Sequence, residues 1–121
     1  YCIDLSLADY DDWRLPTISE LRSLIRGCPD TQTGGACGVT DYCLEKTCFG
    51  TKCGGCRGSQ GPGEGGCYCD AALGGPCNWY WSSSSFADDT TYALYVDFIG
   101  GYVGDDVRPP TNYVRCVRGG R

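Results

Sequence analysis

The spacing of apolar residues near the start of the chain predicts a short helix at residues 17–26. Thr17 and Glu20 stand in the S/T-x-x-E order of a capping box, which begins a helix. Gly27 follows the last apolar position and supplies the stop. The polar residues between the apolar positions of this helix, Arg22 among them, are expected to face away from the core. The apolar face consists of Ile18, Leu21, Leu24 and Ile25.

From residue 79 the pattern changes to that of strands. Residues 79–82 form a predicted aromatic strand, and the alternation across 92–99 predicts a half-buried one. Residues 82–85 are four serines and are predicted to form a plain loop. The remaining predicted elements are a two-residue hairpin turn at Gly100-Gly101, a return strand from Tyr102-Val103, a loop at 105–112 and a final strand at 113–117.

Residues 27–77 show neither the helical nor the strand spacing of apolar residues, and they are rich in glycine and cysteine. A segment of this composition cannot order itself by apolar burial, so cross-links must do so. The chain is therefore expected to be one domain over residues 1–121, with 27–77 as a disulfide-stapled insert. A helix, an insert and an antiparallel sheet in this order form an α+β layout.

The composition of the chain excludes several classes of function. The chain has 11 cysteines and no histidine or methionine, which indicates export to an oxidising compartment and excludes histidine-based catalysis and histidine metal ligands. A net charge of −5 argues against nucleic acid as a partner. No apolar run reaches the roughly 20 residues of a membrane span. The chain opens at Tyr1-Cys2 without a signal peptide, so we expect a trimmed product or a piece of a longer polypeptide.

The cysteines of the insert allow three interpretations. Structural disulfides are favoured, but Cys53 and Cys56, with Cys67 and Cys69, could also form a zinc centre or a redox pair. Because eleven is odd, one thiol is unpaired or bonds to another chain, and Cys69 is the candidate because it lies so close to Cys67. The other insert cysteines expected in disulfides are Cys28, Cys37, Cys43, Cys48, Cys53, Cys56, Cys67 and Cys77.

Three ordered motifs carry a resemblance to a known family. They are DWRLPT at 12–17 followed by ELRSL at 20–24, YWSSS at 80–84, and YVRCVR at 113–118. In this order they resemble the Lcl C-terminal domain family of exported bacterial domains with a C-type-lectin-like fold. The resemblance implies that residues 12–16 lie in the core, that the domain is incomplete at its N-terminus, and that Cys2 bonds to Cys116.

The resemblance also implies a binding face just before the last strand. A glycan or a surface protein is the expected ligand. The alternation of residues 79–81 predicts that one face of this strand is core and that the other could offer an aromatic platform for a sugar ring, with core packing favoured for Trp79 and Trp81. Arg115 and Arg118 are expected to pair with Asp97 or another acid. The candidate ligand-binding residues are Tyr92, Tyr95, Asp97, Tyr102, Asp105, Asp106, Arg108 and Asn112.

Calcium is the one cofactor left open, because short carboxylates suit it. Solvated loop carboxylates are the favoured interpretation, since the chain lacks the sugar-binding tripeptides of animal lectins. The calcium candidates are Asp88, Asp89, Asp97, Asp105 and Asp106.

No catalytic constellation is expected. The carboxylates lie in polar, glycine-rich loops, unlike the apolar cleft that a glycosidase acid needs, and no base is available to activate a serine. The expected function is non-catalytic recognition or adhesion at the bacterial cell surface. The alternative is a structural subunit of a surface appendage or filament, as a homo-oligomer or part of a larger assembly.

Overall fold

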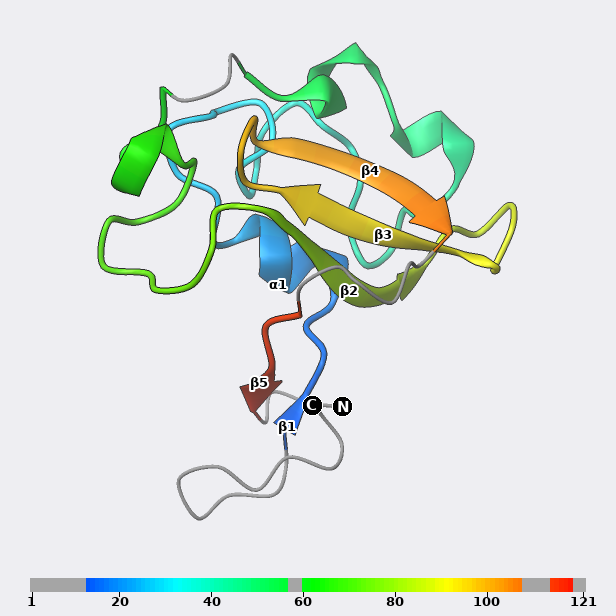
Figure 1. Ribbon diagram of the computed structural model, residues 1–121. Coiled ribbons are helices and arrows are strands. Elements are labelled where there is room, and N and C mark those ends of the chain that lie inside the picture. Colours follow the sequence, from blue (N-terminus) through cyan, green and yellow to red (C-terminus); the bar gives the residue numbers. More distant parts are fainter. Residues whose placement is uncertain (1–12, 57–59, 108–113, 119–121) are drawn as a thin grey trace.

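The protein is a small α+β domain built on a three-stranded antiparallel sheet (Figure 1). A computed structural model describes residues 13–56, 60–107 and 114–118. The sheet has the order β2-β3-β4, with β2 at Trp79–Ser85, β3 at Tyr92–Asp97 and β4 at Tyr102–Val107. A second, two-stranded sheet pairs β1 (Trp13–Arg14) with β5 (Val117–Arg118), so the start and the end of the described chain lie side by side.

The predicted helix forms as α1 at Ile18–Arg22 and is shorter than expected. Its capping box is confirmed: the Thr17 hydroxyl accepts from the Glu20 N–H, and the Glu20 carboxylate accepts from the Thr17 N–H. After the helix the backbone N–H groups bond to carbonyls three positions back. Ile25 then pairs with Cys69 in an isolated antiparallel bridge. The helix therefore ends at Arg22, four residues before the predicted end at Arg26.

Arg22 lies in the interior, so the prediction that it faces away from the core is wrong. Its side chain is 3% exposed. The guanidinium donates to the Thr31 carbonyl at 2.8 Å, to the Gln32 carbonyl at 2.9 Å, and to the Val39 carbonyl. This buried cation therefore ties α1 to the first loop of the insert.

Two strands extend into segments predicted as loops. β2 runs to Ser85, because Ser82 is fully buried and its hydroxyl donates to the Leu94 carbonyl at 2.8 Å. β4 runs to Val107, so Asp105 and Asp106 are strand residues. Both loop predictions are wrong for these residues, since cross-strand hydrogen bonds outweigh the low strand preference of serine and aspartate.

The connection between β3 and β4 has four residues, Phe98–Gly101, and the prediction of a two-residue turn is wrong. Asp97 and Tyr102 are the last pair of the ladder. Phe98 is buried in the core at 2% exposure, so the alternation of β3 continues one residue past the ladder before the chain turns. Gly101 completes the turn at a φ of 69°, which favours glycine.

The insert is cross-linked as expected. It contains the short helices η2 (Lys46–Cys48), η3 (Thr51–Gly54) and η4 (Glu64–Gly66). Cys53 and Cys56 belong to different disulfides, which overturns their interpretation as zinc ligands or a redox pair. Cys69 is the free thiol among the described residues, as predicted. The disulfides are Cys28–Cys56, Cys37–Cys53, Cys43–Cys48 and Cys67–Cys77.

Cys116 is also disulfide-bonded, and its expected partner Cys2 lies outside the described residues. Several disulfides in so small a domain are typical of the oxidising environment of exported proteins. In the described part of the chain, every helix is too short or too polar to cross a bilayer.

The insert packs against the turn between β3 and β4, and Figure 1 shows it running around the sheet beside β4. The Cys56 N–H donates to the Gly100 carbonyl at 2.7 Å, and the Tyr68 N–H donates to the Phe98 carbonyl at 2.9 Å. Gly55 approaches so closely that a Cβ there would lie 2.4 Å from the Gly100 oxygen. The main core lies between α1, the insert and the inner face of the sheet.

Candidate functional site

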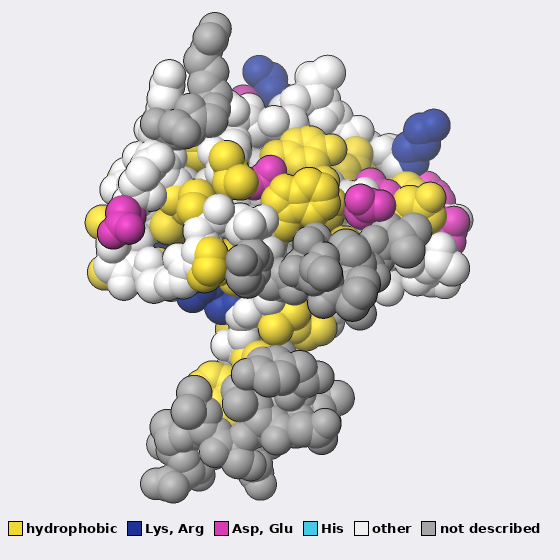
Figure 2. Space-filling view, in the orientation of Figure 1, with side chains coloured by type: hydrophobic (Ala, Val, Ile, Leu, Met, Phe, Trp, Pro, Cys, Tyr) yellow, Lys and Arg dark blue, Asp and Glu magenta, His cyan; other side chains and the backbone are white. Residues whose placement is uncertain are grey.

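The side of the sheet that faces away from the main core carries the strongest candidate site. We call it the outer face; it carries Trp79, Trp81, Tyr95, Asp97 and Tyr102. Residues directly opposite each other in an antiparallel ladder share a face. The register places Trp79, Asp97 and Tyr102 in one row across the three strands. Figure 2 shows hydrophobic side chains gathered over the sheet with acidic side chains beside them.

Four aromatic rings form a cluster on the outer face. Trp79 and Tyr95 stack in parallel with ring centroids 4.4 Å apart. Trp81 meets Tyr95 edge-on at 5.5 Å, and Tyr102 lies 5.9 Å from it. Tyr95 is central and only 5% exposed, whereas Tyr102 is 38% exposed. Tyr102 and the half-buried Trp79 therefore offer the accessible aromatic surface.

Gly104 makes this packing possible, and nothing in the sequence pattern indicated it. It lies opposite Tyr95 in the ladder. A Cβ on Gly104 would lie 2.5 Å from the Tyr102 ring and 2.8 Å from the Tyr95 hydroxyl. The two tyrosines therefore occupy the space that a side chain would fill.

Acidic groups border the aromatic cluster. Asp97 is half-buried, and its Oδ1 accepts from the Ile99 N–H at 2.9 Å. Asp106 is exposed at the other end of β4, opposite Ala93. Burial, followed by the proximity of Tyr102, Asp97 and Asp106, raises the pKa of Tyr95 far above its usual range. Its phenol therefore stays neutral at physiological pH.

Two other predicted binding residues lie on the opposite side of the sheet. Asp105 lies directly opposite Leu94, which faces the core. Tyr92 is two residues before Leu94 on the same strand, so both Asp105 and Tyr92 have inner-face positions. Burial, and secondly the charge of Asp106, raises the pKa of Asp105. Arg108 and Asn112 lie outside the described residues. The outer face thus gathers Tyr95, Asp97, Tyr102 and Asp106 from the predicted set.

The calcium candidates are spread over separate turns. Asp88 accepts from the Lys46 N–H at 2.8 Å, and Asp89 accepts from the N–H and hydroxyl of Thr91. Within the described residues, the group of ligand atoms close enough for a metal is Cys43, Glu45 and Cys48. Both of those sulfurs are committed to a disulfide. The five aspartates therefore form no preassembled centre in this part of the chain, and calcium stays a prediction.

A hollow of about 160 Å³ lies between the insert and the inner face of the sheet. Arg115 lines it, lies over the Tyr80 ring at 4.8 Å and donates to the Gly74 carbonyl at 2.6 Å, so its partners differ from the acid expected. Arg118 belongs to β5. Cys69 also lines the hollow, and burial raises the pKa of its thiol. A protonated, buried thiol is a poor nucleophile.

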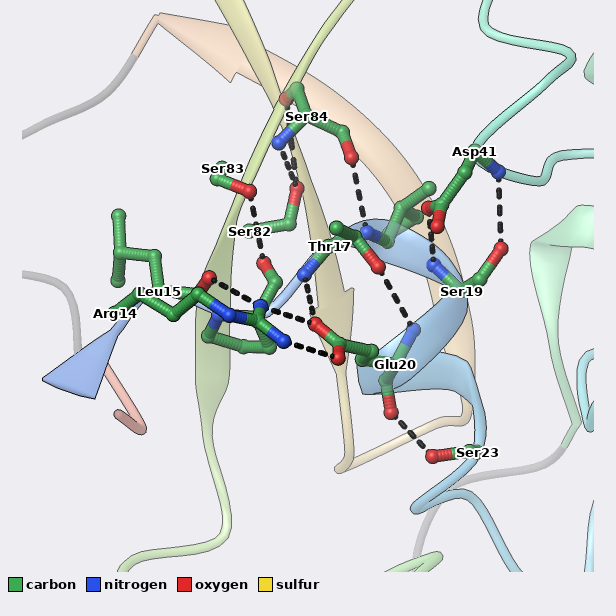
Figure 3. Close-up of polar contacts among 12 residues, drawn as sticks. Arg14, Leu15, Thr17, Ser19, Glu20, Ser23, Asp41, Ser82, Ser83 and Ser84 are labelled. Atoms are coloured by element: carbon green, nitrogen blue, oxygen red, sulfur yellow. Dashed lines mark hydrogen bonds and ion pairs between the residues drawn. The ribbon is translucent and has the colours of Figure 1, made fainter. Parts of the chain in front are cut away.

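The residues of the first two sequence motifs form a structural network (Figure 3). Arg14 donates to both oxygens of Glu20 at 2.7 Å. The Ser84 hydroxyl accepts from the Ile18 N–H at 2.9 Å, and Ser83 donates to the carbonyl of the buried Pro16. These contacts join β2 to the start of α1.

Further contacts join this network to the insert. The Ser19 N–H donates to Asp41, and the Asp41 N–H donates back to the Ser19 hydroxyl.

Comparison with known proteins identifies a family. A family model described as the Lcl C-terminal domain matches residues 1–118. No curated protein and no solved structure matches the chain.

Proposed function

The chain belongs to the Lcl C-terminal domain family, and from this premise we propose that it is an extracellular recognition domain without catalytic activity. It binds a carbohydrate or a protein at the bacterial cell surface. The observation that carries this proposal is the aromatic cluster of the outer face, bordered by Asp97 and Asp106. Aromatic rings that combine an accessible edge with a rigid base are typical of recognition surfaces.

We also propose that the domain has a C-type-lectin-like fold. Three features support this: the α-helix α1 before the sheet, the antiparallel order β2-β3-β4, and the pairing of β1 with β5. In this arrangement the long insert belongs to the loop region, and the sheet holds the binding side chains in place.

The absence of catalysis is part of the proposal. The chain has no histidine, and the Cys69 thiol has a raised pKa. A nucleophile needs a nearby base or a lowered pKa. Serine is plentiful in β2, but Ser82 and Ser84 bond to backbone groups.

The test is a glycan-array assay on the oxidised protein, run with calcium and again with a chelator. We expect specific binding that Tyr102→Ala abolishes. Tyr42→Ala is the matched control, because Tyr42 is 99% exposed and lies in the insert. Binding that both variants retain would contradict the assignment of the outer face. A blank in both conditions would favour the structural role in a surface appendage, unless a protein ligand is found.

A further inference from the structure

Building on the recognition role proposed above, we propose that the outer face binds a lysine or arginine side chain presented by a partner protein. The cation would lie against Asp97, at the border of the aromatic cluster that contains Trp79 and Tyr102. This inference depends on the proposed function and gives its ligand a chemical class.

The row across the three strands supplies the geometry. Trp79, Asp97 and Tyr102 are directly opposite each other, and neighbouring strands lie roughly 4.8 Å apart. Asp97 therefore shares the outer face with both rings, which pack against Tyr95 in the next row. A cation within about 6 Å of a ring centroid is attracted by the ring, so a cation at Asp97 can use both interactions at once.

The charge of the sheet is complementary to a cation. Of the three aspartates in these strands, Asp97 and Asp106 have outer-face positions, and the strands contain no lysine or arginine. The whole chain has a net charge of −5. A basic segment would therefore meet favourable potential on approach, whereas a sulfated ligand would meet repulsion.

The hydrogen-bonding capacity of Asp97 favours a ligand that only donates. Asp97 Oδ1 accepts from the Ile99 N–H, and none of the described residues donates to Oδ2. An ionised carboxylate only accepts, and ammonium and guanidinium groups only donate. A neutral sugar hydroxyl can both donate and accept a hydrogen bond. The Asp97 carboxylate can accept the bond that the hydroxyl donates, but it has no hydrogen to donate in return.

Apolar surface beside the row favours a protein side chain over an amino sugar. Ile99 is 43% exposed and Tyr102 is 38% exposed, and both are close to Asp97 in the turn region. The alkyl stem of lysine or arginine packs on apolar surface while its charged end reaches a polar partner. Tyrosine and tryptophan are also enriched at protein interfaces.

The experiment is an NMR titration of the isotope-labelled oxidised protein with the peptide acetyl-Gly-Arg-Gly-Arg-Gly-amide. The control peptide carries citrulline in place of arginine, which keeps the shape and removes the charge. We expect saturable amide shifts at residues 97–104 with the arginine peptide and at least fivefold weaker binding of the citrulline peptide. Asp97→Asn should weaken arginine-peptide binding by about tenfold, because it removes the charge-assisted bond.

Asp97→Asn retains an oxygen that can accept from the Ile99 N–H, so the turn is preserved. Glu45→Gln removes one charge from an exposed site in the insert, and we expect it to leave the binding constant unchanged. Equal binding of the two peptides, no shifts at residues 97–104, or an unchanged constant in Asp97→Asn would overturn the inference. Binding of a glucosamine trimer without arginine-peptide binding would overturn the choice of a protein ligand.

Failure of this inference is distinguishable from failure of the proposed function. If the arginine peptide does not bind but Tyr102→Ala still abolishes a glycan signal, recognition by the outer face stands and the cationic ligand is wrong. If neither signal depends on Tyr102 or Asp97, both proposals are wrong.

Discussion

Glu20 serves two elements at once. Its carboxylate accepts from the Thr17 N–H at 2.8 Å, which closes the capping box of α1. The same carboxylate holds Arg14, which belongs to β1, through two hydrogen bonds of 2.7 Å. The Arg14 hydrogen bonds, and secondly the Thr17 N–H, lower the pKa of Glu20 to about 2 against the opposing effect of burial.

Glu20→Gln is expected to lower the free energy of unfolding by about 1 kcal/mol near neutral pH, a modest effect because the side chain is 37% exposed and screened by solvent. The lowered pKa means that the carboxylate stabilises the fold above about pH 4.5 and that this contribution is lost as the pH falls toward 2. The difference between wild type and variant should therefore shrink over this range in urea unfolding experiments. Glu45→Gln is the control, and a difference independent of pH would contradict the assignment.

At the scale of elements, the turn between β3 and β4 depends on Gly101. Its φ of 69° is unfavourable for any residue with a side chain. A Cβ there would also lie 3.0 Å from the Cys28 Cβ and 3.1 Å from its sulfur. The turn thus fits closely against the Cys28–Cys56 disulfide.

Gly101→Ala should lower the free energy of unfolding by about 1–2 kcal/mol through backbone strain and this contact. Gly74→Ala is the control, because a Cβ at Gly74 meets nothing within 4 Å and its φ is not in the left-handed region. Urea midpoints measure both. Equal midpoints for the two variants would show that the turn tolerates a side chain.

Some features of the elements are determined by residues close in sequence and could be predicted, whereas others depend on contacts with distant residues. The start of α1 could be predicted because Thr17 and Glu20 cap it with their own side chains. Its end could not, because Arg22 is drawn inward by carbonyls of residues 31–39. The alternation in β3 placed Tyr95 and Asp97 on one face, as observed. The role of Gly104 depends on its partner across the ladder, which the sequence pattern does not reveal.

At the scale of the whole molecule, the disulfides leave one free thiol among the described residues. This thiol belongs to Cys69, which is 8% exposed. Alkylation without reductant should modify no cysteine in the native protein and one per chain after unfolding in urea. Peptide mass spectrometry should locate the modification at Cys69. Modification of another cysteine would contradict the pairing, and no modification after unfolding would show that Cys69 bonds to another chain.

The contact between Gly55 and Gly100 has a consequence for engineering. The insert touches the turn through backbone atoms, and this turn carries the chain from Asp97 to Tyr102. A chimera in which residues 27–77 are replaced by a loop of another domain must therefore present a glycine at the same place, or the grafted loop will displace the turn. Conversely, a combinatorial library at positions 79, 97 and 102 can be screened with the insert left intact, because the hydrogen bonds from the insert to Phe98 and Gly100 then remain in place.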